Sequence, residues 1–287
     1  MTRIDAHQHY WTLGLGHNDW PPPELAPIYR DFTPDDLMPH LAAAGITKTV
    51  LVQAAPNLAE TEFLLELAQC EETVAAVVGW VDVWSPTARS DLERFKLHPK
   101  FRGIRPMLQG IEDAFCILQP EAIRTLEMLP DLGLRFDALV QPRHLPVISA
   151  LADRLPSLPI VVDHGAKPFI GKGILEPWRA DMAALARRPN VCVKLSGLVT
   201  EAGSGWTVDE LKPYAGYLIE IFGPQRVMFG SDWPVVNLDA SYEQWWLAAN
   251  ELLRNLDESA RQAVFRTSAA RFYGIDLEGQ VRASGFT

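Results

Sequence analysis

The chain has 287 residues, of which 48% are hydrophobic and 22% are charged, as is usual for a globular protein. Its formal net charge of −10 argues against anionic partners, so we expect it to bind neither nucleic acid nor an acidic membrane surface. No apolar run approaches the roughly 20 residues of a membrane helix. The three cysteines are too few and too scattered for a disulfide framework. We therefore expect a cytoplasmic protein, a monomer or a small homo-oligomer, whose partner is a small molecule.

Short apolar runs alternate with amphipathic stretches along the whole sequence. The runs are rich in Val, Ile and Leu, as strands buried on both faces are, and amphipathic stretches between them predict helices. The predicted strands are residues 2–9, 48–55, 74–83, 101–108, 134–140, 159–164, 190–196 and 226–232. Because the composition does not shift along the chain, we predict one α/β domain over residues 1–287, a (β/α)8 TIM-type barrel.

A long segment rich in Trp and Pro, residues 10–30, follows the first predicted strand. Loops of this length in compact domains often serve a function. The segment either contributes to a site or only covers the rim of the barrel, and the sequence favours neither interpretation.

Two histidines end the first predicted strand. Active sites of β/α barrels lie at the carboxyl ends of the strands. His7 and His9 are two residues apart, so both side chains face the same side, into the barrel. Two imidazoles at this spacing can hold one metal ion or stabilise one oxyanion.

A histidine and an aspartate end two later strands. His164 closes the sixth strand, where it either serves the site or bonds to the backbone. Asp163 has the opposite parity, and we expect it to face outward or to cap the next helix. Asp232 closes the eighth strand, where it either caps the following segment or deprotonates water. The position at a strand end favours a catalytic role for His164 and Asp232.

Other strand ends add polar and aromatic groups. Arg105 closes the fourth strand and is predicted to bind a carboxylate or hydroxyl groups. Lys194 ends the seventh strand, and His144, just beyond the fifth, either enters the site or caps its helix. Trp80 and Trp84, at the end of the third strand, can stack on a substrate ring or pack in the core.

Four short motifs in this order resemble the amidohydrolase superfamily, in particular its amidohydrolase-related branch of sugar-lactone hydrolases. The motifs are IDAHQH (4–9), DHGAKP (163–168), KLSGL (194–198) and FGSDWP (229–234). The closing stretch 250–274 is similar to that branch as well, so the resemblance covers nearly the whole chain. It implies a distorted β/α barrel.

The resemblance also implies a metal site. His7, His9, His164 and Asp232 would hold one divalent ion, with Zn²⁺ the expected identity, or would act without a metal as some relatives do. Members with two metals carry a bridging lysine or glutamate at the end of the fourth strand. Arg105 stands there and cannot ligate a metal, so we expect no second ion.

We predict a lactonase that opens a sugar lactone of the L-fucono-, L-rhamnono- or L-galactono- type through attack by water that Asp232 activates. The residues expected to bind the substrate are Arg105, Lys194 and His144 at its hydroxyl groups and Trp80, Trp84, Trp206 or Trp233 at its apolar face. Two alternatives stay open. One is a decarboxylase of an aromatic or dienoic acid on the same barrel, and the other is a non-catalytic barrel that binds a sugar acid.

Overall fold

The computed structural model describes residues 2–15 and 20–277 of the chain. Within them, eight parallel strands pair in sequence order. The strands are β1 (Ile4–Gln8), β2 (Lys48–Val52), β3 (Val74–Gly79), β4 (Phe101–Ile104), β5 (Arg135–Ala138), β6 (Ile160–Val162), β7 (Val191–Leu195) and β8 (Val227–Phe229). Each ends earlier than predicted, because the chain leaves the hydrogen-bonded ladder there and enters the loops that carry the site.

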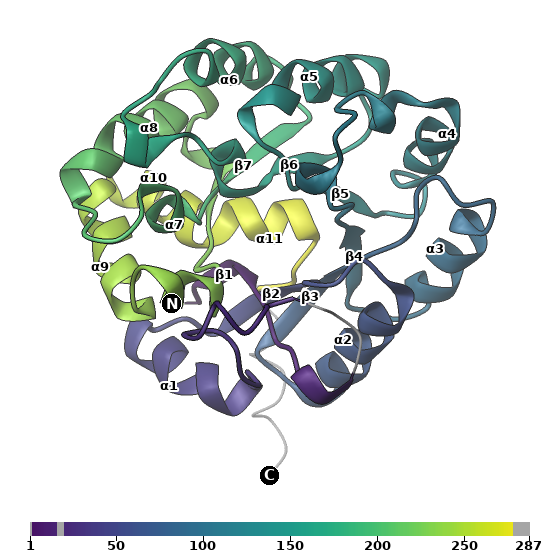
Figure 1. Cartoon of the computed structure of the whole chain (residues 1–287), viewed down its shortest axis with the longest axis horizontal. Coiled ribbons are helices and arrows are strands. Elements are labelled where there is room, and N and C mark those ends of the chain that lie inside the picture. Colours follow the sequence, from purple (N-terminus) through teal and green to yellow (C-terminus); the bar gives the residue numbers. More distant parts are fainter. Residues whose placement is uncertain (1, 16–19, 278–287) are drawn as a thin grey trace.

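Helices surround the strands on the outside (Figure 1). Between strands lie α1 (Pro34–Ala44), α2 (Leu58–Cys70), α3 (Ala88–Lys96), α4 (Pro120–Met128), α5 (Leu145–Arg154), α6 (Trp178–Ala186), α7 (Leu198–Ala202) and α8 (Val208–Phe222). After β8 come α9 (Tyr242–Leu252), α10 (Glu258–Gln262), a π-helical turn (Ala263–Thr267) and α11 (Ser268–Tyr273). This alternation confirms the predicted (β/α)8 barrel. Among the helices described, none is long and apolar enough to cross a lipid bilayer.

The barrel interior is filled by small and branched side chains, and α11 closes its amino-terminal end. Helix α11 lies across the barrel in Figure 1, and its buried side chains belong to one cluster with interior residues of β1, β2, β3, β6 and β8. Arg135, the first residue of β5, donates to the carbonyl of Phe272 in α11. With one end filled by apolar groups, the polar side chains of the interior collect toward the carboxyl ends of the strands.

The barrel closes where the chain after β8 meets β1. The backbone N–H of Asp232 donates to the carbonyl of His7 (2.8 Å), and the N–H of His9 donates to the carbonyl of Trp233 (2.7 Å). Gly230 permits this close approach, since an added Cβ would lie 2.7 Å from the Cβ of His7. Closure thus brings an aspartate from one end of the sequence beside two histidines from the other.

Candidate active site

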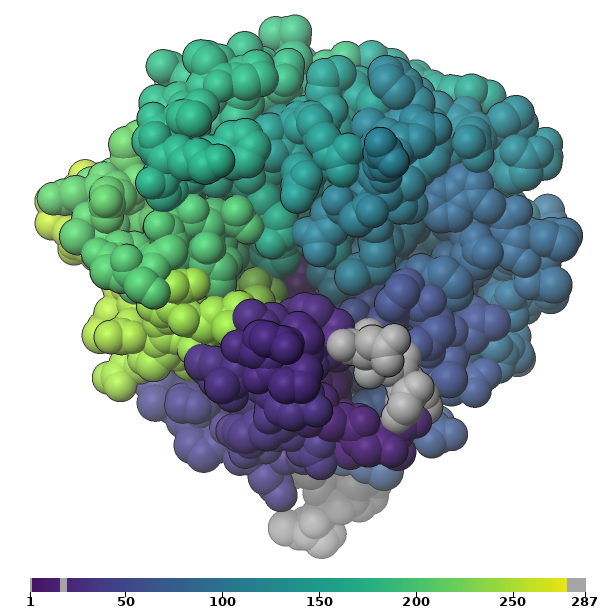
Figure 2. All heavy atoms as spheres, viewed as in Figure 1, coloured from purple at the N-terminus to yellow at the C-terminus, as the bar shows by residue number. Residues whose placement is uncertain are grey.

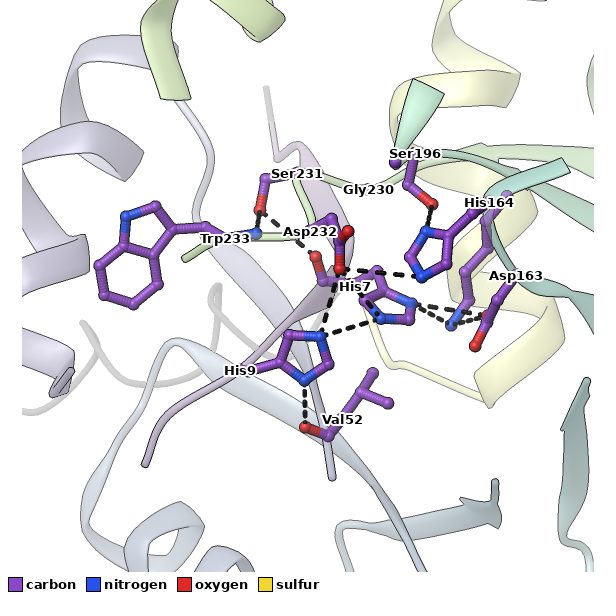
Figure 3. A network of polar contacts seen from close by, with 12 residues as sticks. His7, His9, Val52, Asp163, His164, Ser196, Gly230, Ser231, Asp232 and Trp233 are labelled. Atoms are coloured by element: carbon purple, nitrogen blue, oxygen red, sulfur yellow. Dashed lines mark hydrogen bonds and ion pairs between the residues drawn. The ribbon is translucent and has the colours of Figure 1, made fainter. Parts of the chain in front are cut away.

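The four side chains predicted from the strand ends converge at the carboxyl end of the barrel (Figure 3). His7 Nε2 lies 3.2 Å from His9 Nε2 and 3.6 Å from Asp232 Oδ1. The same carboxylate oxygen lies 3.3 Å from His9 Nε2 and 3.8 Å from His164 Nε2. All four residues are buried. One carboxylate oxygen therefore stands among three imidazole nitrogens.

The spacing of three of these groups suits a metal ion. Ligand atoms bound to a tetrahedral zinc at about 2.0–2.1 Å lie about 3.3 Å from one another. The separations among His7, His9 and Asp232 are 3.2, 3.3 and 3.6 Å. His9 also has a suitable tautomer, because its Nδ1–H donates to the carbonyl of Val52 (2.8 Å) and leaves a lone pair on Nε2. These residues can therefore hold a divalent metal ion.

A left-handed turn after β6 carries His164 into the site. The φ angles of His164, Gly165, Ala166 and Lys167 are 53°, 57°, 63° and 52°. For each residue other than glycine, this region costs roughly 1–2 kcal/mol. Trp178 holds the turn by donating its indole N–H to the carbonyl of Gly165 (2.7 Å), and Lys167 N–H donates to the carbonyl of His164 (2.9 Å). Strain of this kind is typical of functional sites.

Asp163 faces the barrel interior, so the prediction that it faces outward or caps a helix is wrong. Val161, two residues earlier, packs inside the barrel, and Asp163 shares its parity. The carboxylate lies 3.0 Å from Lys194 Nζ and 3.5 Å from both Arg105 Nη1 and His7 Nδ1. Burial raises the pKa of Asp163, but the charge of Lys194 and the other neighbours outweigh burial and hold the pKa well below its usual range.

Lys194 lies beneath the histidines rather than in an open cavity. Its side chain has 0% exposure, and Nζ lies 2.6 Å from Asp137 Oδ2. Tyr273 of α11 donates its hydroxyl to the same carboxylate oxygen (2.6 Å). Because buried charges need such partners, Lys194 is fully engaged within the protein. The predicted contact of Lys194 with substrate hydroxyl groups is therefore not supported.

Asp232 is held as a carboxylate among neutral rings. Burial raises the pKa of Asp232, whereas the three histidines around it lower that pKa, and the net result lies well below the usual range. Burial lowers the pKa of His164 to about 4, although Asp232 opposes this effect. Burial, and then the charge of Lys194, lower the pKa of His7 well below its ordinary value. These shifts favour an ionised Asp232 beside neutral imidazole rings near neutral pH.

A cavity of about 360 Å³ opens above these groups. Of the described residues, those that line it are His9, Arg105, His164 and Asp232 together with Trp20, Leu25, Ala54, Pro56, Met107, Gln109, Leu139, Lys167, Val235 and Leu238. The purple amino-terminal part of the chain borders a hollow near the centre of the face in Figure 2. Through Trp20 and Leu25, the segment 10–30 contributes to the cavity wall, although residues 16–19 lie outside those described.

The tryptophans predicted for the apolar wall lie elsewhere. Trp233 is buried, and its indole points away from the histidines and packs edge-on against Phe32 (Figure 3). Trp84 and Trp206 line separate surface grooves. Trp80 lies outside the cavity wall, and its backbone bonds to the hydroxyl of Thr61. Of the nine tryptophans in the sequence, the one at the cavity is Trp20, from the loop after β1.

Of the two other residues predicted to bind substrate, Arg105 lines the cavity and His144 does not. His144 lies outside the cavity wall and completes the cap of the short 3-10 turn Pro142–His144 that precedes α5, because its Nδ1 accepts the backbone N–H of Gln141 (3.1 Å). Arg105 does line the cavity, with Nη1 3.4 Å from His7 Nε2. Contact between Arg105 and a substrate stays a prediction.

Asp5 holds the backbone of two site segments in place, a role that the sequence analysis does not predict. Its Oδ1 accepts the backbone N–H groups of Ser231 (2.8 Å) and His7 (3.2 Å), and its Oδ2 accepts the hydroxyl of Tyr242 (3.1 Å). These bonds tie β1 to the turn that carries Asp232. The sequence feature that could have indicated this role is the position of Asp5 within an apolar strand, because a buried carboxylate requires hydrogen-bond partners.

Comparison with known proteins identifies the family of the chain. The amidohydrolase family model matches residues 4–275. An L-fucono-1,5-lactonase of Burkholderia ambifaria is 46% identical over 278 residues, covering 96% of each chain. Another of Burkholderia multivorans is 35% identical, covering 98% of each chain. The crystal structure of a Burkholderia multivorans amidohydrolase with bound zinc has a TM-score of 0.92 at 34% identity, over 96% of this chain and 100% of that one. The chain belongs to the amidohydrolase family.

Proposed function

We propose that the protein is a lactonase that hydrolyses a sugar lactone to its aldonic acid, with L-fucono-1,5-lactone as the first substrate to test. The observation that carries the proposal is the carboxylate of Asp232 at the wall of a cavity, with one oxygen 3.3–3.8 Å from the Nε2 atoms of three histidines. The cavity of about 360 Å³ is large enough for one sugar ring. The two relatives named for L-fucono-1,5-lactone support the same substrate class.

Asp232 acts as the general base in this proposal. Its carboxylate takes a proton from a water molecule while the water oxygen bonds to the lactone carbonyl carbon. The negative charge that passes to the carbonyl oxygen is stabilised by N–H donors of Arg105, which lines the same cavity. The ring carbon–oxygen bond then breaks, and Asp232 returns the proton to the leaving oxygen. The product is an open-chain acid whose carboxylate forms near Arg105.

One divalent ion, with zinc as the expected identity, would be held by His7, His9 and Asp232. When bound, it supplies Lewis-acid polarisation of the carbonyl group and a lower pKa for a bound water. We expect no second ion, because Asp163, the next carboxylate inward, is already paired with two cationic side chains.

A pH-indicator assay against a panel of L- and D-sugar lactones, in both 1,4 and 1,5 ring sizes, tests the function. The expected result is acid release well above the spontaneous rate for one stereochemical series, and the same assay after chelation reports whether a metal is needed. No release from any lactone, with zinc present, would contradict the proposal. Carbon dioxide release from aromatic acids would then indicate a decarboxylase.

Trp20 is expected to bind the sugar ring rather than to take part in chemistry. It lines the cavity and is braced edge-on by Trp11, with ring centroids 5.2 Å apart. Trp20→Ala should raise KM about tenfold, or about 1.4 kcal/mol, with little change in kcat. Trp84→Ala, at a separate surface groove, is the matched control. A KM unchanged in Trp20→Ala would remove Trp20 from the binding surface.

The acid limb of the pH profile should report His164. Because burial lowers its pKa to about 4, we expect kcat/KM to stay level from pH 7 to about 5 and to fall as the ring gains a proton near pH 4. A protonated His164 would pair with Asp232, 3.8 Å away, and weaken it as a base. Stopped assays with a neutral lactone measure this profile. An acid limb near the ordinary histidine pKa of about 6.5 would contradict it.

A further inference from the structure

Lys194 makes a contact with His7 that hydrolysis does not use. Its Nζ lies 3.0 Å from His7 Nδ1, 2.6 Å from Asp137 Oδ2 and 3.0 Å from Asp163 Oδ1. Between two carboxylates the lysine is an ammonium, which has three hydrogens and no lone pair. It can only donate, so His7 Nδ1 must accept. The contact therefore decides which nitrogen of the ring carries a proton.

A neutral imidazole has one N–H, so acceptance at Nδ1 places the proton of His7 on Nε2. There it meets suitable acceptors. His9 Nε2 lies 3.2 Å away and has a free lone pair, because the proton of His9 is on Nδ1, bonded to Val52. The carboxylate of Asp232 lies 3.6 Å away. The Nε2–H of His7 thus points toward the groups of the reaction.

The opposite tautomer of His7 makes less favourable contacts at both ring nitrogens. A proton on Nδ1 would face the Lys194 ammonium at 3.0 Å, and the lone pairs of His7 and His9 would face each other at 3.2 Å. Two contacts favour that tautomer, namely Asp163 Oδ1 at 3.5 Å from Nδ1 and Arg105 Nη1 at 3.4 Å from Nε2. Both distances are longer than the 3.0 Å contact with Lys194, so the contacts as a whole favour the tautomer with the proton on Nε2.

We propose that Lys194 is a positioning residue that holds His7 with its proton on Nε2, so that Lys194 and a divalent metal ion compete for His7. A metal ligand must present a lone pair, so binding at Nε2 requires the proton to move to Nδ1 and the ammonium to release the ring. Asp163 is the acceptor that Nδ1–H would then use. The lysine lowers the metal affinity of the site, and it gives the metal-free site an N–H donor next to Asp232.

The first test is ¹⁵N NMR of the histidine rings in the metal-free, full-length protein, with the His7 signals assigned by their loss in His7→Gln. We expect the chemical shift of a protonated nitrogen at Nε2 and of an unprotonated one at Nδ1. The reverse pattern would overturn the proposal. The inference rests on the proposed metal ligands but needs no substrate, so an inactive protein in the lactone assay and a wrong tautomer are separate outcomes.

The second test is zinc affinity, measured by competition with a chelating dye. Lys194→Met combined with Asp137→Asn removes one positive and one negative charge, and Tyr273 can still donate to the new amide oxygen. We expect zinc to bind roughly tenfold more tightly, the scale of effects of residues that contact a metal ligand. Asp137→Asn alone keeps the lysine and is the control, with affinity near that of the wild type. Unchanged or weaker binding in a folded double variant would overturn the proposal, and if that variant does not fold, the NMR result decides.

Discussion

Asp232→Asn is expected to lower kcat by about 10³-fold while KM changes little. The amide has the shape of the carboxylate but cannot take a proton from water. The wild-type group is ionised at neutral pH, because the surrounding histidines hold its pKa well below the usual range despite burial. The lost interaction belongs to the transition state, so the loss should appear in kcat. Steady-state kinetics with the lactone found in the panel measure it.

Asp239→Asn is the matched control for this substitution. Asp239 lies in the same connection after β8, and its Oδ1 accepts the hydroxyl of Ser204 (3.0 Å) away from the cavity wall. Its kcat should stay within about twofold of the wild type. Zinc content measured in both variants separates loss of a base from loss of a ligand. If Asp232→Asn kept more than about a tenth of the wild-type kcat, water would be activated by another group.

The meeting of His7, His9, His164 and Asp232 was predictable because it follows from topology. Parallel strands present their carboxyl ends at one side of a barrel, so polar residues at those ends must be neighbours. The alternation of side chains also predicts that His7, in β1, and His9, just after it, face the same side. The sequence could not show that backbone bonds between Asp232 and His7 form the closing seam of the barrel, because that pairing joins segments with no local signal.

The prediction that Asp163 faces outward is wrong because the inward parity at the end of β6 belongs to Asp163 and not to His164. With His164 taken as the inward residue at this strand end, parity predicts that Asp163 faces outward. The period of two of β6 continues one residue beyond the strand, so Val161 and Asp163 both face the barrel interior. His164 reaches the site through a left-handed turn of four residues, a conformation that residues other than glycine rarely adopt. The period of two therefore gives no direction for a side chain once the left-handed turn begins at His164.

The depth of Lys194 along the barrel axis could not be predicted from the sequence either. Lys194 is predicted at the end of the seventh strand, but the alternation of side chains does not give its depth along the barrel axis. Lys194 lies within β7 and is sealed below the histidines, whereas Ser196, just beyond that strand, bonds to His164 Nδ1 (2.9 Å). Trp20 was missed for a different reason. It lies in a loop, where no periodicity relates sequence position to direction.

Gly230→Ala is expected to lower both the stability and the activity of the protein. An added Cβ would lie 2.7 Å from His7 Cβ, 3.2 Å from His7 N and 3.2 Å from Ser196 Cβ. Atoms fixed to the backbone cannot rotate away, so the chain after β8 must move away from β1. We expect a loss of about 1–3 kcal/mol in the free energy of unfolding. A shift of about 1 Å at Asp232 should lower kcat about 10²-fold.

Urea unfolding and steady-state kinetics measure both effects, and Gly216→Ala is the matched control. Gly216 lies within α8, where an added Cβ meets nothing within 4 Å, so the same change there should raise stability by roughly 0.5–1 kcal/mol and leave kcat unchanged. The comparison separates the effect of an added methyl group from its effect at the seam. If Gly230→Ala kept both stability and activity, the contact between β8 and β1 would not set the position of Asp232. The bond from Asp232 N–H to the His7 carbonyl (2.8 Å) forms at this contact. If the contact tolerated an added methyl group, close approach of the two segments would not explain why glycine occupies position 230.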